Sequence, residues 1–144
     1  MKLVSFQLRN YKSFSDSGER RFGDGFNIIV GQNNAGKSAL LQGISLRFGN
    51  NPHLSLKTKP TPANVVIPQS EVLFSVECDG EELRTILLGR EAQFALPTPN
   101  GKPFNEQTMR EVLDRLFSAR RVVIPLRRVG NGGIETAKTP SFAD

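Results

Sequence analysis

The sequence is poor in the residues that hold soft metals or form disulfides. It contains one cysteine, Cys78, and one histidine, His53. A single thiol cannot form a disulfide within the chain, and a structural zinc ion takes four ligands, most of them from these two residue types. The sequence therefore predicts neither a disulfide framework nor a zinc site, and we expect both residues to be bystanders.

Long apolar runs are also lacking. No stretch approaches the roughly 20 apolar residues that cross a bilayer, and the opening residues Met-Lys-Leu-Val-Ser contain no long apolar signal region. The 144 residues are 38% apolar, with a mean hydropathy of −0.31, which is typical of a soluble globular domain with a modest core. We expect a cytoplasmic protein with no membrane segment.

The positive charge is unevenly distributed. The net charge of +5 consists of +4 in residues 1–50, −2 in residues 51–100 and +3 in residues 101–144. A basic first third agrees with a site for phosphate groups and with nucleic acid nearby. Solvated lysines and arginines explain the same charge equally well, so it does not establish DNA binding.

The first fifty residues predict a strand, a glycine-bearing loop and a helix. Apolar side chains alternate over Lys2–Arg9, the period of a half-buried strand, and a polar turn over residues 10–14 leads to a second, short strand near residues 20–22. The apolar residues of Phe26–Val30 run together, which is typical of a strand covered on both faces. After the loop, apolar residues recur at helical spacing over residues 37–48.

The remaining residues predict an antiparallel β region, a helix and a strand. Asp79-Gly80 tolerates positive φ and therefore suits the turn of a two-residue hairpin. We expect a proline-rich loop at 51–70 and a β region at 71–104 with strands Val72–Cys78, Glu81–Leu88 and 92–96. Residues 105–129 should contain an amphipathic helix and a short strand, Val122–Ile124, and residues 130–144 a connecting tail. We expect Pro125 to end the last strand.

The chemistry of the chain is concentrated in the loop Gly31-Gln32-Asn33-Asn34-Ala35-Gly36-Lys37-Ser38. A polyphosphate needs many amide donors close together, and Gly31 and Gly36 give the backbone the freedom to wrap around it. The helix that follows adds its N-terminal amides and the positive end of its dipole. Lys37 would place its ammonium on the β- and γ-phosphates, and the Ser38 hydroxyl would complete the shell of a bridging Mg²⁺. A chance match is the alternative, but the predicted strand and helix on either side favour a site for ATP or a close purine triphosphate.

A family resemblance begins with these residues. The opening strand, the turn Arg9-Asn10-Tyr11-Lys12-Ser13-Phe14 and the run from Asn27 to Leu41 are similar to the N-terminus of ABC-type ATPases of the RecF, SMC and OLD (overcoming lysogenization defect) group of AAA ATPases. The resemblance implies an α/β P-loop NTPase fold, a partial ABC-ATPase-like head with an antiparallel β layer beside the strand–loop–helix unit. Asn34, where many relatives carry glycine, leans toward the OLD-like ATPases, many of which act against phages.

The resemblance also implies roles for individual residues. The turn after the first strand lies beside the base and sugar of the nucleotide in this group, so Arg9, Lys12 and Ser13 become candidate contacts, with a plain surface turn as the alternative. Ala39 lacks the hydroxyl often found after the loop serine and keeps only its backbone amide as a phosphate donor. The Ile-Pro-x-x-Arg run implies that Arg127 or Arg128 lies near the γ-phosphate, although solvated arginines explain it as well.

Several parts of a hydrolytic site are missing from the sequence. No four-residue apolar run is followed by Asp-Glu to hold the Mg²⁺ shell, and there is neither a Leu-Ser-Gly-Gly-like loop nor a switch histidine. The chain therefore carries half of an ATP site, either as the N-terminal lobe of a longer ATPase or as a short subunit that another polypeptide completes. The tail at residues 130–144 is typical of a connection to further chain, which favours the N-terminal lobe of a longer ATPase. The resemblance implies a homodimer or larger oligomer, in which ATP joins two heads and hydrolysis releases them.

Four functions are compatible with these features. An ATPase head in DNA repair, chromosome maintenance or anti-phage defence is favoured, with DNA, a nuclease or another effector as possible partner. A module that holds ATP without hydrolysing it is the second. A transporter ATPase is disfavoured by the opening turn, and a small-molecule kinase by the lack of an arginine-rich lid motif. The sequence leaves the effector and the pathway open.

Overall fold

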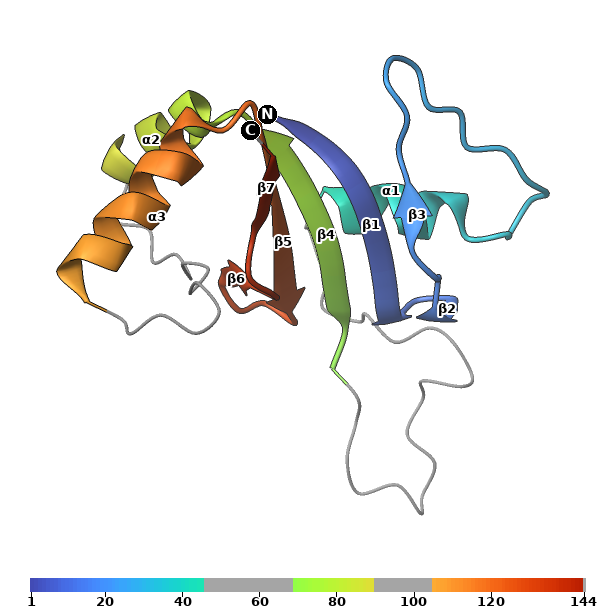
Figure 1. The fold of residues 1–144 in the computed structure, drawn as a ribbon. Helices are drawn as coiled ribbons and strands as arrows, with labels where there is room; N and C mark the ends of the chain where they lie inside the picture. Colours follow the sequence, from blue (N-terminus) through green and yellow to red (C-terminus); the bar gives the residue numbers. More distant parts are fainter. Residues whose placement is uncertain (46–68, 90–104, 144) are drawn as a thin grey trace. The chain divides into compact units, whose positions relative to one another are not determined.

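The computed structural model describes residues 1–45, 69–89 and 105–143 and has a mixed α/β fold, as expected (Figure 1). Its elements are β1 (Lys2–Tyr11), β2 (Phe14–Asp16), β3 (Arg20–Arg21), α1 (Lys37–Ile44), β4 (Glu71–Cys78), α2 (Gly80–Gly89), α3 (Glu106–Ser118), β5 (Arg121–Val129), β6 (Ile134–Thr136) and β7 (Ser141–Ala143). Hydrogen-bonded neighbours follow the order β2-β1-β4-β5-β6, with β3 also paired to β1 and β7 to β5. Among these residues, no helix has the length and apolar character needed to span a bilayer.

The chain divides into two compact units, which we describe separately. The first, here called the loop unit, comprises residues 4–74 and 127–135 and contains the glycine-bearing loop. The second, here called the two-helix unit, comprises residues 1–3, 75–126 and 136–144.

The core of the loop unit forms between β1 and α1. The predicted alternation of β1 is confirmed, because Phe6 and Leu8 are both buried, and β1 continues two residues past Arg9. Figure 1 shows α1 alongside β1. A Cβ on Gly43 would lie 2.6 Å from a methyl carbon of Leu8, so the helix can approach the strand this closely only because residue 43 is a glycine.

The core of the two-helix unit forms where α2 and α3 pack together, and its buried members are Cys78, Leu83, Leu116, Ala119, Val122 and Ile124. The predicted amphipathic helix is confirmed as α3. It begins with a reciprocal pair of hydrogen bonds, in which the Asn105 side chain accepts from the Thr108 amide at 2.9 Å and the Thr108 hydroxyl accepts from the Asn105 amide at 3.0 Å. The Arg110 guanidinium also pairs with Glu106 one turn away at 2.7 Å.

The expected hairpin across Asp79-Gly80 is wrong in its second half. Residues 71–78 form a strand, but Glu81–Leu88 lies within helix α2. Asp79 caps this helix, because its carboxylate accepts from the Glu82 amide at 2.7 Å and the Glu82 side chain accepts from the Asp79 amide at 3.3 Å. Gly80 fits because a Cβ there would lie 2.4 Å from the Phe117 carbonyl oxygen. The Asp-Gly pair therefore begins a helix and does not make a hairpin turn.

The expected buried strand Phe26–Val30 is also wrong. These residues belong to no strand, and Phe26, Ile28 and Val30 are 103%, 83% and 84% exposed. In Figure 1 they lie on the open trace between β3 and α1. A strand needs a neighbour that satisfies its backbone, and no described strand pairs with this segment. The run of apolar residues predicted burial between two layers, and no described element covers these residues.

Four smaller expectations differ from the structure. The polar turn over residues 10–14 is shorter than expected, because Tyr11 ends β1 and Phe14 begins β2, and these two residues are paired. Pro125 does not end its strand, since β5 runs on to Val129 and the Pro125 carbonyl accepts from the Ala137 amide at 2.8 Å. The expected tail contains β6 and β7. Helix α1 ends at Ile44, and residues 46–68 and the strand expected at 92–96 lie outside the described residues.

Candidate functional site

The glycine-bearing loop leads directly into α1, as predicted. Gly36 is the N-cap of this helix with φ 88° and ψ 9°, a left-handed conformation that favours glycine. Asn34 also has positive φ, at 66°, which a non-glycine residue adopts at a cost of roughly 1 kcal/mol or more. The Ala35 amide donates to the Gln32 carbonyl at 3.2 Å and closes the bend. The backbone therefore turns sharply just before the helix, where N-terminal amides are available to an anion.

The turn between β1 and β2 packs against this bend. A Cβ on Gly36 would lie 2.7 and 2.9 Å from two ring carbons of Phe14 and 2.9 Å from the Ser13 hydroxyl oxygen. Carbon atoms in normal contact are about 3.5–4.0 Å apart. The Phe14 ring and the Ser13 side chain thus occupy the space that any other residue at position 36 would need.

The Lys37 ammonium lies over the same bend. It donates to the Gly31 carbonyl at 2.6 Å and to the Gln32 carbonyl at 2.7 Å. These acceptors are neutral, and a charged oxygen accepts a stronger hydrogen bond from an ammonium group than a carbonyl does. The arrangement keeps the cation at the loop and suits its transfer to a phosphate oxygen.

A cavity of about 600 Å³ lies between the β1–β2 turn and the loop. Its volume falls within the range of about 300–1,000 Å³ that is usual for small-ligand sites. It is lined by Lys12, Ser13, Asn33, Asn34, Gly36, Lys37, Ser38 and Ala39, eight of the candidate residues. The loop residues Gly31, Gln32 and Ala35 shape the bend but do not line the cavity.

Arg9, Arg127 and Arg128 are engaged elsewhere in the loop unit. The Arg9 guanidinium lies 3.4 Å from Asp16 and 3.4 Å from Glu71. Arg127 pairs with Glu135 at 2.6 Å, and this carboxylate raises the pKa of the guanidinium. Arg128 donates to the Gly132 carbonyl at 2.9 Å. None of the three arginines lines the cavity, so their predicted contacts with nucleotide stay predictions.

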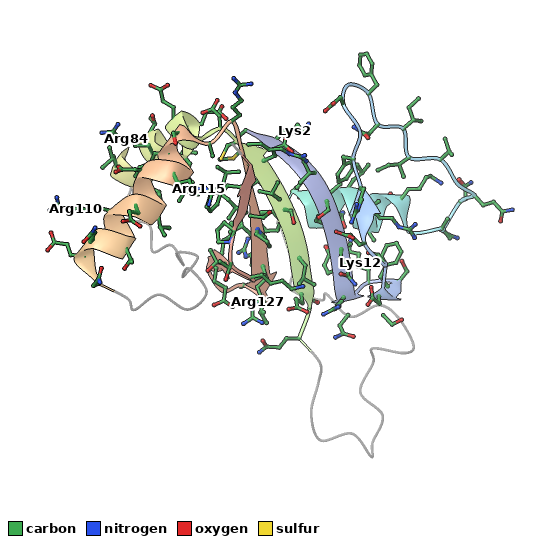
Figure 2. All side chains as sticks on the ribbon, in the orientation of Figure 1. Lys2, Lys12, Arg84, Arg110, Arg115 and Arg127 are labelled. Carbon is green, nitrogen blue, oxygen red and sulfur yellow. The ribbon has the colours of Figure 1, made fainter. Side chains whose placement is uncertain are left out.

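Gln42 is a residue that sequence reasoning missed. The Lys12 ammonium, at the end of β1 (Figure 2), donates to the Gln42 side-chain oxygen on α1. It also lies 5.7 Å from the centre of the Tyr11 ring. Gln42 stands four residues after Ser38, which places the two on one face of α1. This spacing was the one sequence signal that could have marked it.

A second cavity of about 430 Å³ lies beside the first within the loop unit. Its lining is largely apolar and includes Phe14, Phe22 and residues 28–30, with Arg20 and Arg21 also contributing. Gly36 and Lys37 line both cavities. The exposed segment that was expected to be a strand therefore forms one wall of a groove that adjoins the loop.

No metal-binding cluster of three or more His, Cys, Asp or Glu side chains occurs in the part of the chain that the structure describes. The one predicted Mg²⁺ contact, Ser38, lines the larger cavity together with Lys37. A hydroxyl is a suitable oxygen ligand for Mg²⁺, which keeps most of its remaining positions for phosphate oxygens and water. The donor set therefore fits a magnesium ion that arrives with a polyphosphate and does not fit one held by protein carboxylates.

Three comparisons with known proteins gave matches. The sequence profile of the family described as AAA ATPase domain matches residues 1–93. DNA replication and repair protein RecF from Hydrogenovibrio crunogenus is 34% identical over 91 residues, which are 62% of this chain and 24% of RecF. The chain thus spans about a quarter of the length of this curated relative. A solved chain from work on the ATP-driven dimerization and DNA-stimulated activation of SMC ATPases aligns with 98% of this chain and 72% of its own length, with 20% identity and a TM-score of 0.43.

Proposed function

Because the chain belongs to the AAA ATPase domain family, we propose that it binds ATP with Mg²⁺ in the 600 Å³ cavity beside the loop. One observation carries the proposal: the left-handed Gly36 opens helix α1 directly onto a cavity lined by Lys37 and Ser38. Amides at a helix N-terminus and an ammonium group form a site for a polyphosphate. Lys37 would leave the loop carbonyls for the phosphate oxygens, and Ser38 would bind the Mg²⁺. Lys12 and Ser13, on the opposite wall, would contact the rest of the nucleotide.

We infer that hydrolysis needs residues beyond those that line this cavity. No Asp or Glu lines the cavity in the described part of the chain, whereas hydrolysis needs a carboxylate near the Mg²⁺ and a group that orients water. The exposure of Phe26, Ile28 and Val30 supports the same inference, because large exposed apolar side chains favour burial against another surface. We propose that a C-terminal lobe covers this segment and completes the ATPase. The alternative is a module that binds ATP without hydrolysing it. The lack of Asp and Glu among the described cavity-lining residues favours this alternative for the isolated chain.

The proposed setting is DNA maintenance. The support is the name of the relative RecF, which describes DNA replication and repair. An OLD-like role in anti-phage defence is the second setting and rests on Asn34 alone. In either case we propose that ATP joins two heads into a homodimer, and light scattering of the complete protein should then show a mass that doubles when ATP and Mg²⁺ are added. An unchanged mass would contradict the dimer and leave ATP binding untouched.

Nucleotide binding is tested by a charge-matched pair of variants. Lys37→Ala removes the ammonium at the cavity, and Lys138→Ala removes an exposed lysine of the two-helix unit. A charged hydrogen bond is worth roughly 1.5–3 kcal/mol, so Lys37→Ala should weaken ATP binding by about tenfold or more, while Lys138→Ala should leave it unchanged. Titration with a fluorescent ATP analogue in the presence of Mg²⁺ measures both. Equal affinities for the two variants would contradict the proposed site.

Hydrolysis is tested separately by phosphate release from the complete protein, with Lys37→Ala as the control. Release that Lys37→Ala abolishes would support an ATPase head. Tight ATP binding without release would support the binding module.

A further inference from the structure

The turn that carries Lys12 and Ser13 to the cavity has a strained backbone. Asn10 has φ 49° and Lys12 has φ 48°, and neither is a glycine. Each such residue costs of the order of 1 kcal/mol or more and persists only where its surroundings enforce the conformation. The buried residue between them, Tyr11, fixes the middle of the turn. Contacts that hold its two ends therefore decide where Lys12 points.

Ser70 holds the first end of this turn. Its hydroxyl donates to the Asn10 carbonyl at 2.7 Å, and the Asn10 side chain donates weakly to the Gln69 carbonyl at 3.4 Å. The Ser70 residue is only 2% exposed, so its hydroxyl is shielded from water. Its own carbonyl accepts from the Gly130 amide at 2.7 Å. Ser70 is thus fixed between β1 and the turn that follows β5.

The other end of the turn meets the site. Lys12 donates to Gln42 on α1, and Ser13 lies against the bend at Gly36. Both residues line the cavity, whereas Ser70 and Gln42 do not. The turn therefore connects Ser70 with the cavity.

We infer that Ser70 is a positioning residue for nucleotide binding: its hydrogen bond to Asn10 keeps the strained turn in the shape that directs Lys12 to the ligand. The inference rests on the proposed function and goes beyond it, because it assigns a role to a buried residue outside the cavity. Without the hydroxyl, the Asn10 carbonyl loses its partner and the turn relaxes from its two left-handed residues. The Lys12 ammonium then no longer occupies one position at the cavity wall.

The loop unit offers a matched control in Ser17. This serine is also buried, at 5% exposure, and its hydroxyl also bonds to β1, accepting from the Leu8 amide at 2.9 Å and donating to the Gly18 carbonyl at 2.9 Å. Ser17→Ala therefore loses at least as much hydrogen bonding as Ser70→Ala, but it leaves the Asn10–Ser13 turn in place. An effect on ATP binding that came only from lower stability would be at least as large for Ser17→Ala.

The experiment measures ATP affinity for the two serine variants at a temperature where circular dichroism shows both folded. We expect Ser70→Ala to weaken ATP binding about fivefold, within the range for one lost hydrogen bond, and Ser17→Ala to change it less than twofold. Ser70→Cys keeps the shape of the side chain with a slightly larger atom and a weaker donor, and its ATP affinity should fall between those of the parent and Ser70→Ala. This variant also serves if the alanine variant fails to fold. Equal affinities for the Ser17 and Ser70 variants would overturn the inference.

A second measurement separates positioning from a merely structural role. If Ser70 acts through Lys12, the double variant Lys12→Ala/Ser70→Ala should bind ATP no more weakly than Lys12→Ala alone, because the two changes remove one interaction. Lys12→Ala and Ser70→Ala should both reduce the salt dependence of ATP binding, whereas Ser17→Ala should not. Additive losses would overturn the inference. A parent protein that binds no ATP would overturn the proposed function and this inference together. If Lys37→Ala weakens ATP binding as expected and Ser70→Ala leaves it unchanged, only the inference is overturned.

Discussion

Replacing Gly36 by alanine tests the tight contact between the loop and the β1–β2 turn. The new methyl group would have two costs. It would occupy a backbone with φ 88°, and it would lie 2.7 Å from the Phe14 ring and 2.9 Å from the Ser13 hydroxyl. Gly25 provides the matched control, because its φ is 84° and nothing lies within 4 Å of a Cβ built there. Both glycines belong to the loop unit. The difference between the two variants therefore isolates the steric contact.

The expected magnitudes follow from these two costs. A left-handed backbone disfavours alanine by roughly 1–2 kcal/mol, and the stiffer unfolded chain offsets roughly 0.4–1 kcal/mol of this. Gly25→Ala should thus lower the free energy of unfolding by about 0–1.6 kcal/mol. Gly36→Ala adds the overpacking of Phe14 and Ser13, about 1–3 kcal/mol more. For a chain of this size, this difference corresponds to a midpoint temperature lower by about 3–10 °C.

Thermal unfolding without nucleotide, followed by circular dichroism, measures both variants. Truncating the ring with Phe14→Ala should then reduce the extra cost of Gly36→Ala, since the two changes share one contact. The ATP affinity of Gly36→Ala should also fall, because the bend cannot keep its shape. Similar midpoint temperatures for the two alanine variants, or no rescue by Phe14→Ala, would refute the close packing described here.

Three further predictions concern the two-helix unit. Burial raises the pKa of the Cys78 thiol, so an alkylating reagent should label Cys78 slowly in the native protein and rapidly in urea; rapid native labelling would contradict its burial. The hydrogen bond from Arg121 lowers the pKa of Glu77. The contribution of this pair to stability is therefore present above the normal glutamate pKa and disappears as the pH falls through the lowered value. Glu77→Gln should flatten the acid side of a stability–pH curve, and an unchanged curve would exclude this pair as a contributor. Gly80→Ala should lower the free energy of unfolding by about 1–3 kcal/mol, because the new Cβ would lie 2.4 Å from the Phe117 carbonyl oxygen. An unchanged free energy of unfolding in urea would show that α2 and α3 can separate at this point.

The parts of the site that sequence reasoning identified are those that a short stretch of chain determines by itself. The bend at Gly36, the start of α1 and the place of Lys37 and Ser38 all follow from residues within one loop and one helix turn. Lys12 and Ser13 line the same cavity as the loop residues, which their spacing alone did not require, and their contact with a nucleotide stays a prediction. Gln42 and Ser70 were missed because their roles come from contacts with residues 30 and 60 positions away in sequence.

The errors in the fold have equally definite causes. Asp79-Gly80 fits both a hairpin turn and a helix N-terminus, and the contact between Gly80 and Phe117 that favours the helix is not local. Leu83, Ile86 and Leu87 recur at helical spacing, a signal that the strand prediction did not use. For Phe26–Val30, the apolar pattern expressed a preference for burial, which the described residues alone do not satisfy.

The exposed apolar segment Phe26–Val30 has a practical consequence for handling the protein. A run of exposed, β-branched and aromatic side chains with no charge among them promotes self-association between chains, particularly at high concentration. Light scattering of the purified 144 residues should therefore rise with concentration and with salt, and substituting Ile28 by lysine should suppress this rise without changing a residue that lines the 600 Å³ cavity. If a C-terminal lobe covers this segment, as proposed above, co-expression with that lobe should suppress the rise as well.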